Sequence, residues 1–157
     1  MKTSPLLSYL AFISGSALAA TVKQPSACVT DTNQLLITGL YCGAGESVTF
    51  TGDATAVTNQ QCFTQSGNPV QGVPKKRSES VSIGPTTIDP TDTGCVPICI
   101  ESDEVVPTLQ CTGTQKAQIV GSVSFTDVSI TGSNLPKPIT FKSVTNKCTE
   151  SELACLP

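Results

Sequence analysis

Eight cysteines constrain this chain of 157 residues more than any other feature of its sequence. An even number of cysteines in a short chain that follows a secretory leader is typical of a disulfide framework, because the secretory pathway is oxidising. The sequence therefore predicts four bridges. Eight cysteines allow about a hundred connectivities, so the pairing stays open. The residues concerned are Cys28, Cys42, Cys62, Cys95, Cys99, Cys111, Cys148 and Cys155.

Residues 1–19 have the three parts of a signal peptide. Lys2 supplies the basic start, an apolar stretch runs from Leu6 to Ala19, and Ala17-Leu18-Ala19 provides the small residues that precede cleavage. The apolar stretch is shorter than the roughly 20 residues of a spanning helix, and serines interrupt it. We therefore expect a secreted, extracellular protein with no membrane partner, in which residues 20–157 form a single cysteine-rich β domain.

Alternating apolar and polar residues predict strands in the body of the chain. Ser47–Thr51 alternates strictly, and Ala54–Thr58 is expected to return beside it across a tight turn at Gly52-Asp53. Further strands are predicted at Gln34–Leu40, Val105–Thr112, Gln118–Phe125, Asp127–Thr131 and Pro138–Val144. Several short strands of this kind favour an all-β fold, namely a disulfide-stapled antiparallel β-sandwich or small barrel. Near the C-terminus, Glu150–Leu156 is expected to form a short helical turn with Thr149 as its N-cap.

The region around 67–97 has a different composition, rich in proline, glycine and charged residues, and predicts an exposed loop. It contains the basic run Lys75, Lys76 and Arg77, which is similar to a site for a dibasic processing protease of the late secretory pathway. A solvated loop that is never cut explains the same residues equally well. Nine basic against twelve acidic residues give a formal net charge of −3, which disfavours nucleic acid as a partner.

The absence of histidine from the sequence narrows the chemistry available to the chain. Neither a Ser-His-Asp nor a Cys-His arrangement can form, and oxidised cysteines supply no thiolate nucleophile. A zinc site is disfavoured because Cys95 and Cys99 are separated by three residues and no histidine assists them. A carboxylate pair could come from the acidic residues Asp89, Asp92, Glu101, Asp103 and Glu104. Such residues are normally just solvated, so we expect no catalytic residue, no metal and no cofactor.

Glycan binding usually needs exposed aromatic side chains, and this sequence contains few aromatic residues. No tryptophan is present, and after residue 19 the aromatic residues are Tyr41, Phe50, Phe63, Phe125 and Phe141. Three of the phenylalanines fall on the apolar phase of predicted strands and are assigned to the core. Tyr41 and Phe63 remain as candidate surface contacts, although each adjoins a cysteine that would draw it inward. A polar groove that binds glycans weakly is still allowed.

Together, the Ala-Leu-Ala leader, the eight cysteines, the richness in Thr, Ser and Val, and the Lys75-Lys76-Arg77 run resemble the small secreted cysteine-rich proteins of filamentous fungi. This class includes effector candidates of plant pathogens. The resemblance implies an interaction protein that suppresses plant host defence by binding an unknown host protein, in the extracellular space or after translocation into host cells. The alternative is a fungal cell-surface or cell-wall component that associates with glycans. Neither function requires an active site.

Overall fold

The computed structural model describes residues 19–43, 45–89 and 94–156, and these residues form two antiparallel sheets with one short helix. The smaller sheet has the strand order β1-β2-β5, with β1 at Thr21–Val29, β2 at Leu35–Cys42 and β5 at Cys95–Glu101. The leader predicted at residues 1–19 lies almost wholly outside the described residues.

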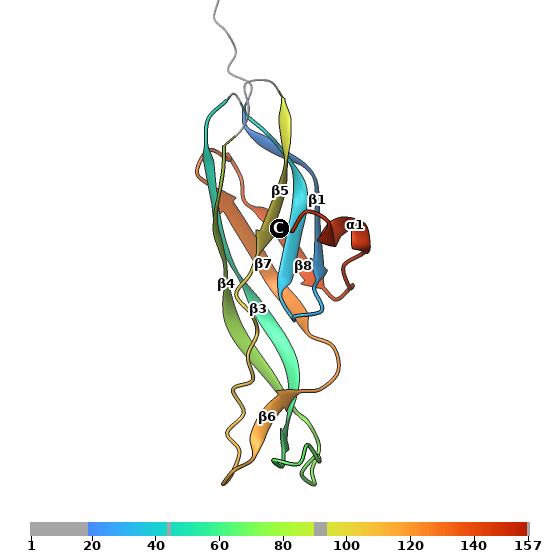
Figure 1. The fold of residues 1–157 in the computed structure, drawn as a ribbon. Coiled ribbons are helices and arrows are strands. Elements are labelled where there is room, and N and C mark those ends of the chain that lie inside the picture. The colour runs from blue at the N-terminus through green and yellow to red at the C-terminus, as the bar shows by residue number, and fades with distance from the viewer. Residues whose placement is uncertain (1–18, 44, 90–93, 157) are drawn as a thin grey trace, which may run out of the picture.

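The larger sheet has the order β4-β3-β7-β8, and a short strand β6 pairs with the far end of β3. The bounds of these strands are β3 Val48–Phe63, β4 Lys75–Ile88, β6 Lys116–Ile119, β7 Ser124–Gly132 and β8 Ile139–Val144. Figure 1 shows the smaller sheet stacked on the upper part of the larger one, while β6 and the ends of β3 and β4 extend below it. The predicted all-β sandwich is confirmed, and the two sheets do not close into a barrel.

The apolar phase of the strands forms a single core between the sheets. Along β3, alternate residues such as Phe50, Ala54 and Ala56 are fully or almost fully buried, and Leu35 and Ile37 of β2 meet them from the other layer. The ring of Tyr41 packs edge-on against that of Phe50, with 5.9 Å between ring centroids. Strict alternation is what a half-buried strand requires, because successive side chains point to opposite faces.

Four regions of the sequence fold differently from the strand and turn predictions. No hairpin turn forms at Gly52-Asp53, because these residues lie within the continuous strand β3 and pair with both β4 and β7. Val105–Thr112 forms no strand, and the predicted strand at Gln118–Phe125 is divided between β6 and β7. The first strand, β1, was not predicted.

The prediction of an exposed loop around 67–97 is also wrong for most of that range. Its beginning is irregular, but Lys75–Ile88 forms β4 and Cys95–Glu101 forms β5, and residues 90–93 between them lie outside the described residues. Proline suggested a loop, yet the prolines inside described strands are Pro25, Pro85 and Pro97, which lie in β1, β4 and β5. All three strands are sheet edges, where a residue without an N–H group can be accommodated without losing a ladder bond.

All eight cysteines are paired, which confirms the predicted disulfide framework. Cys42–Cys95 joins directly opposed residues of β2 and β5, and Cys62–Cys111 holds the segment after β5 against the end of β3. Cys28–Cys148 and Cys99–Cys155 fasten the C-terminal segment to the smaller sheet. The bridges therefore fix segments far apart in the sequence at both ends of the sandwich.

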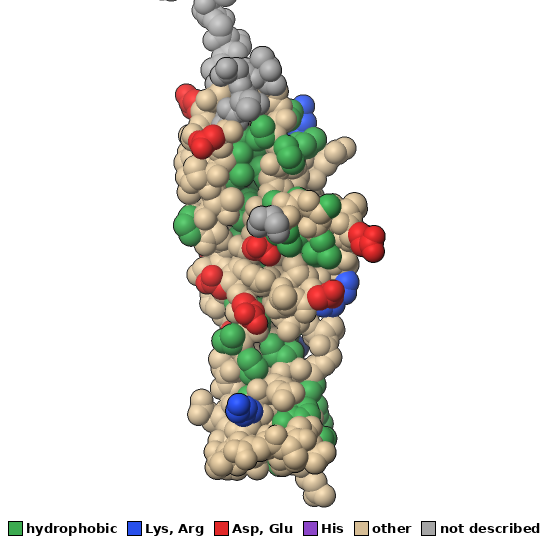
Figure 2. Space-filling model, in the orientation of Figure 1, with side chains coloured by type: hydrophobic (Ala, Val, Ile, Leu, Met, Phe, Trp, Pro, Cys, Tyr) green, Lys and Arg blue, Asp and Glu red, His purple; other side chains and the backbone are tan. Residues whose placement is uncertain are grey.

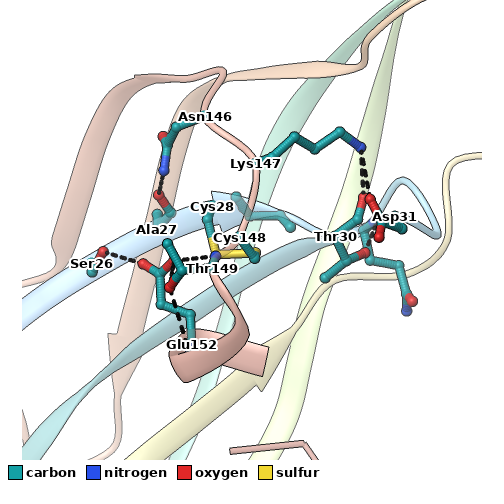
Figure 3. Close-up of a disulfide and its surroundings, with 12 residues drawn as sticks. Ser26, Ala27, Cys28, Thr30, Asp31, Asn146, Lys147, Cys148, Thr149 and Glu152 are labelled. Atoms are coloured by element: carbon teal, nitrogen blue, oxygen red, sulfur yellow. Dashed lines mark hydrogen bonds and ion pairs between the residues drawn. A yellow bond between two sulfur atoms is a disulfide. The ribbon is translucent and has the colours of Figure 1, made fainter. Parts of the chain in front are cut away.

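The C-terminal segment is anchored along β1 by more than a disulfide (Figure 3). The Val29 N–H donates to the Asn146 carbonyl oxygen at 2.9 Å, and the Cys148 N–H donates to the Val29 carbonyl oxygen at 3.0 Å. Beyond them lies the predicted helical turn, α1 at Glu150–Leu153, which has a complete capping box between Thr149 and Glu152. The C-terminal prediction is thus confirmed, and the segment closes one side of the sandwich.

Candidate functional site

The lower end of the molecule, where β3 and β4 project beyond the smaller sheet, is organised around one buried amide (Figure 1). Gln60 is fully buried, and its side-chain oxygen accepts the N–H groups of Thr108 and Leu109 at 2.9 and 2.7 Å. Its amide nitrogen donates to Thr58 and to Glu79, each at 3.0 Å. Every hydrogen-bonding capacity of a buried amide must be met, since an orphaned group costs about 1–3 kcal/mol. The Gln60 side chain therefore makes the hydrogen bonds to the backbone of Thr108 and Leu109 that a neighbouring strand would otherwise make.

This network explains why the segment after β5 is ordered without being a strand. The side chain of Gln60 binds the backbone of that segment, and Thr108 also donates its hydroxyl hydrogen to Glu79. Cys62–Cys111 then fixes the segment covalently beside β3. The sequence reasoning missed Gln60. The signal was available, because Gln60 continues the inward phase of Ala54, Ala56 and Thr58.

An amide-lined cleft with a volume of about 180 Å³ opens beside this network. Its walls come from the end of β3, the loop that precedes β4, and the segment held by Gln60. Gln61 is already engaged, because its amide nitrogen donates to the carbonyl oxygens of Val70 and Gly72. Gln71 and Gln110 are exposed, and the exposed Lys75 also lines the cleft. The cleft thus presents amide donors and acceptors and one cation.

The basic run predicted to lie on a loop forms the start of an edge strand instead. Lys75, Lys76 and Arg77, which we call the basic edge, are exposed and pair through the backbone with Gln60, Asn59 and Thr58 of β3. Opposed residues of an antiparallel pair share a face, so Lys75 and Arg77 lie on the face of Gln60 and Lys76 on the other. None of the three forms an ion pair with a described residue. Their charges also hinder pairing with another sheet.

Proteolytic processing at the basic edge stays a prediction, and the structure changes its physical requirements. A protease would have to detach part of β4 from β3 before it could bind this segment. Cleavage after Arg77 would separate the chain into two pieces that remain covalently joined. Three disulfides, Cys28–Cys148, Cys42–Cys95 and Cys62–Cys111, each connect a cysteine before the cut with one after it.

The described acidic residues among those considered as a carboxylate pair do not all lie in one place. Asp89, which accepts a hydrogen bond from Ser47, directly follows β4, whereas Asp103 donates its N–H to the Ser82 carbonyl oxygen farther down that strand. The ladder contact at Ile83 and Ser102 places these two aspartates about 20 Å apart along β4. Figure 2 shows acidic side chains spread singly over the visible face. Glu101 is half-buried, Glu104 is exposed, and Asp92 lies outside the described residues.

No group of three or more potential metal ligands is formed by the described residues. One carboxylate nevertheless has a shifted pKa. Hydrogen bonds from the Thr149 backbone N–H and hydroxyl, with a further one from Ser26, lower the pKa of Glu152 below its ordinary value. This effect belongs to the cap of α1 rather than to a reactive centre, because Glu152 faces the N-terminus of its own helix (Figure 3).

The aromatic residues occupy mostly interior positions. Tyr41, Phe50 and Phe125 are fully buried, and Phe141 is half-buried against the core, so Tyr41 is no surface contact. Phe63 is half-buried at the end of β3 and keeps part of its surface accessible. Among the described residues, Phe63 is therefore the one aromatic side chain left on which a sugar ring could stack.

Comparison with protein-family models, with curated proteins and with solved structures found no match to this chain. Among the residues that the structure describes, no helix is long and apolar enough to cross a membrane. Four disulfides in a chain of this size are consistent with an oxidising, extracellular environment.

Proposed function

We propose that this chain is a secreted effector-like protein that suppresses plant host defence by binding a host protein, and that it acts without catalysis. The proposal rests on the arrangement of side chains at the lower end of the molecule. There the basic edge and the amide-lined cleft lie side by side on a body held rigid by Gln60 and Cys62–Cys111. A rigid, preorganised surface lowers the entropy cost of association.

The charge of the basic edge suggests the chemistry of the partner. Three unpaired cations on an otherwise acidic protein would steer it toward an acidic surface of the host protein. Since exposed amides in the cleft can donate and accept hydrogen bonds, they would add directional contacts beside the charges. The disulfides would stabilise this surface in an oxidising extracellular environment.

Expression of residues 20–157 in plant leaf cells, with and without a secretion signal, tests the proposal. The readout is the defence-associated oxidative burst after a standard elicitor. Suppression is the expected result, and the form that suppresses identifies the side of the host membrane on which the target lies. An undiminished burst with both forms, at protein levels verified by immunoblot, would contradict the effector function.

A second candidate function is association with glycans of the fungal cell wall, and the amide-lined cleft is the observation that favours it. Side-chain amides such as those of Gln71 and Gln110 can bond the hydroxyl groups of a sugar. Retention of the protein on chitin or β-glucan would support this function. Replacing both glutamines by alanine should then release the protein, and retention that survives this change would place the contact elsewhere.

A further inference from the structure

A second hollow lies at the opposite end of the sandwich, between the beginnings of two edge strands. Its volume is about 380 Å³, within the usual range of small-molecule sites, whereas the amide-lined cleft is smaller. One wall is formed by Ala20 and the start of β1 as far as Pro25, and the other is the β7–β8 connection with the start of β8. We call this hollow the apolar trough.

The trough lies between β1 and β8, which share no sheet ladder among the described residues. At the other end of β1, Val29 pairs with Lys147 and the edges are closed. Nearer the trough, the register of β1 shifts between Lys23 and Ser26, and Gln24 has a φ of 50°. A bulge with a non-glycine residue in this conformation costs free energy and is found preferentially at functional sites.

The walls of the trough are apolar and stiff. Val22 and Ile139 contribute aliphatic side chains from the two strands, and Leu135 packs between the trough and the core. Pro25, Pro136 and Pro138 frame the opening, and proline has a fixed φ, so little conformational entropy would be lost on binding. The trough is therefore largely preformed.

The charge at the rim selects the kind of molecule that fits. Lys137 is the one charged side chain that lines the trough among the described residues, and its ammonium group forms no ion pair with them. If the predicted leader is removed, the chain begins at Ala20. Its α-ammonium group would then lie at the same rim, because Ala20 itself lines the trough. An aliphatic interior with a cationic rim matches an aliphatic chain that ends in an anion.

We propose that the apolar trough binds a single-chain fatty acid, with its alkyl chain along Val22 and Ile139 and its carboxylate at Lys137. This proposal does not rest on the effector function. It adds a small-molecule site at the end of the protein opposite the basic edge.

Isothermal titration of residues 20–157 with hexanoate, octanoate, decanoate and dodecanoate, each below its micelle concentration, tests the site. Affinity should rise about fourfold per added methylene, until the chain fills the trough and the gain stops. The variant Lys137→Gln should weaken decanoate binding about two- to fivefold and leave 1-decanol binding unchanged, since an exposed ion pair contributes little. The control Lys142→Gln, on an exposed lysine outside the trough, should change neither.

A blocking variant separates this site from adventitious binding. Thr21 is exposed and lines the trough, so Thr21→Trp should fill the opening without entering the core and should abolish binding. Each of three results would overturn the proposal: no saturable binding, an affinity that does not change with the length of the alkyl chain, or undiminished binding by Thr21→Trp. Binding only to vesicles that contain anionic lipid, and never to the monomeric fatty acids, would assign the trough to a membrane surface and would also overturn it.

Discussion

Opening the Cys28–Cys148 bridge should cost less than its separation of 120 residues suggests, because the other disulfides shorten the loop. The shortest covalent path between these cysteines runs from Cys28 to Cys42, across to Cys95, on to Cys99, across to Cys155 and back to Cys148. This path contains about 25 residues. Three of the four bridges therefore lie on one covalent ring.

Chain-entropy reasoning gives the magnitude. A ring of this size restricts the unfolded chain by about 3.5 kcal/mol, whereas an isolated loop of 120 residues would give about 4.9 kcal/mol. The double variant Cys28→Ala/Cys148→Ala should thus lose about 3.5 kcal/mol of unfolding free energy. Cys99→Ala/Cys155→Ala opens the same ring and should lose the same amount, although its separation is 56 residues.

Equilibrium unfolding in urea under non-reducing conditions measures both losses. Tyr41 is the one tyrosine beyond residue 19 and is fully buried, so its fluorescence reports on the core without interference from tryptophan. A loss near 5 kcal/mol for the first variant with a clearly smaller loss for the second would refute the ring argument. A loss below about 1 kcal/mol for either would show that the bridge restricts the unfolded chain little.

Three further predictions concern single side chains. Gln60→Ala removes the acceptor of two backbone N–H groups and should lower the free energy of unfolding, measured in urea, by about 2–4 kcal/mol. The control Gln118→Ala, at an exposed position, should change it by less than about 0.5 kcal/mol. Tyr41→Phe removes a buried hydroxyl that has no hydrogen-bond partner among the described residues, so it should leave stability unchanged or raise it; a loss above about 1 kcal/mol would reveal a missed partner. Because the pKa of Glu152 is lowered in the folded protein, its cap stabilises above the ordinary glutamate pKa, and this contribution disappears as the pH falls through the lowered value. Glu152→Gln should therefore lower the free energy of unfolding at pH 7, and this free energy should fall less steeply with decreasing pH than that of the parent protein. Parallel pH profiles for the two proteins would contradict this assignment.

The cysteine framework and the core strands could be predicted from the sequence because each depends on local signals. Alternation in Ser47–Thr51 corresponds to the buried and exposed faces of β3, and in β8 Ile139 and Phe141 are half-buried while Thr140 and Lys142 are exposed. The capping box of α1 likewise lies within a few residues of Thr149. Such patterns need no knowledge of distant partners.

The errors arose where distant contacts decide the local structure. Gly52 predicted a turn, but it is needed inside β3 because a Cβ atom there would collide with the Ser129 carbonyl oxygen of β7. The basic edge was predicted as loop, yet β3 supplies the backbone partners that make it a strand. Gln60 and the apolar trough depend on segments brought together only by the fold. One sequence alone carries no direct signal for these juxtapositions.

The most direct test of the proposed function changes the basic edge while the scaffold stays intact. Lys75→Gln/Lys76→Gln/Arg77→Gln alters only exposed side chains, and Lys23→Gln/Lys142→Gln removes two exposed charges outside both the basic edge and the apolar trough as the control. Both proteins should show unchanged urea unfolding midpoints, within about 0.5 kcal/mol. In the leaf-cell oxidative burst assay, we predict that the basic-edge variant loses suppression and that the control keeps it. Equal suppression by both variants would contradict the assignment of the partner surface to the lower end of the sandwich.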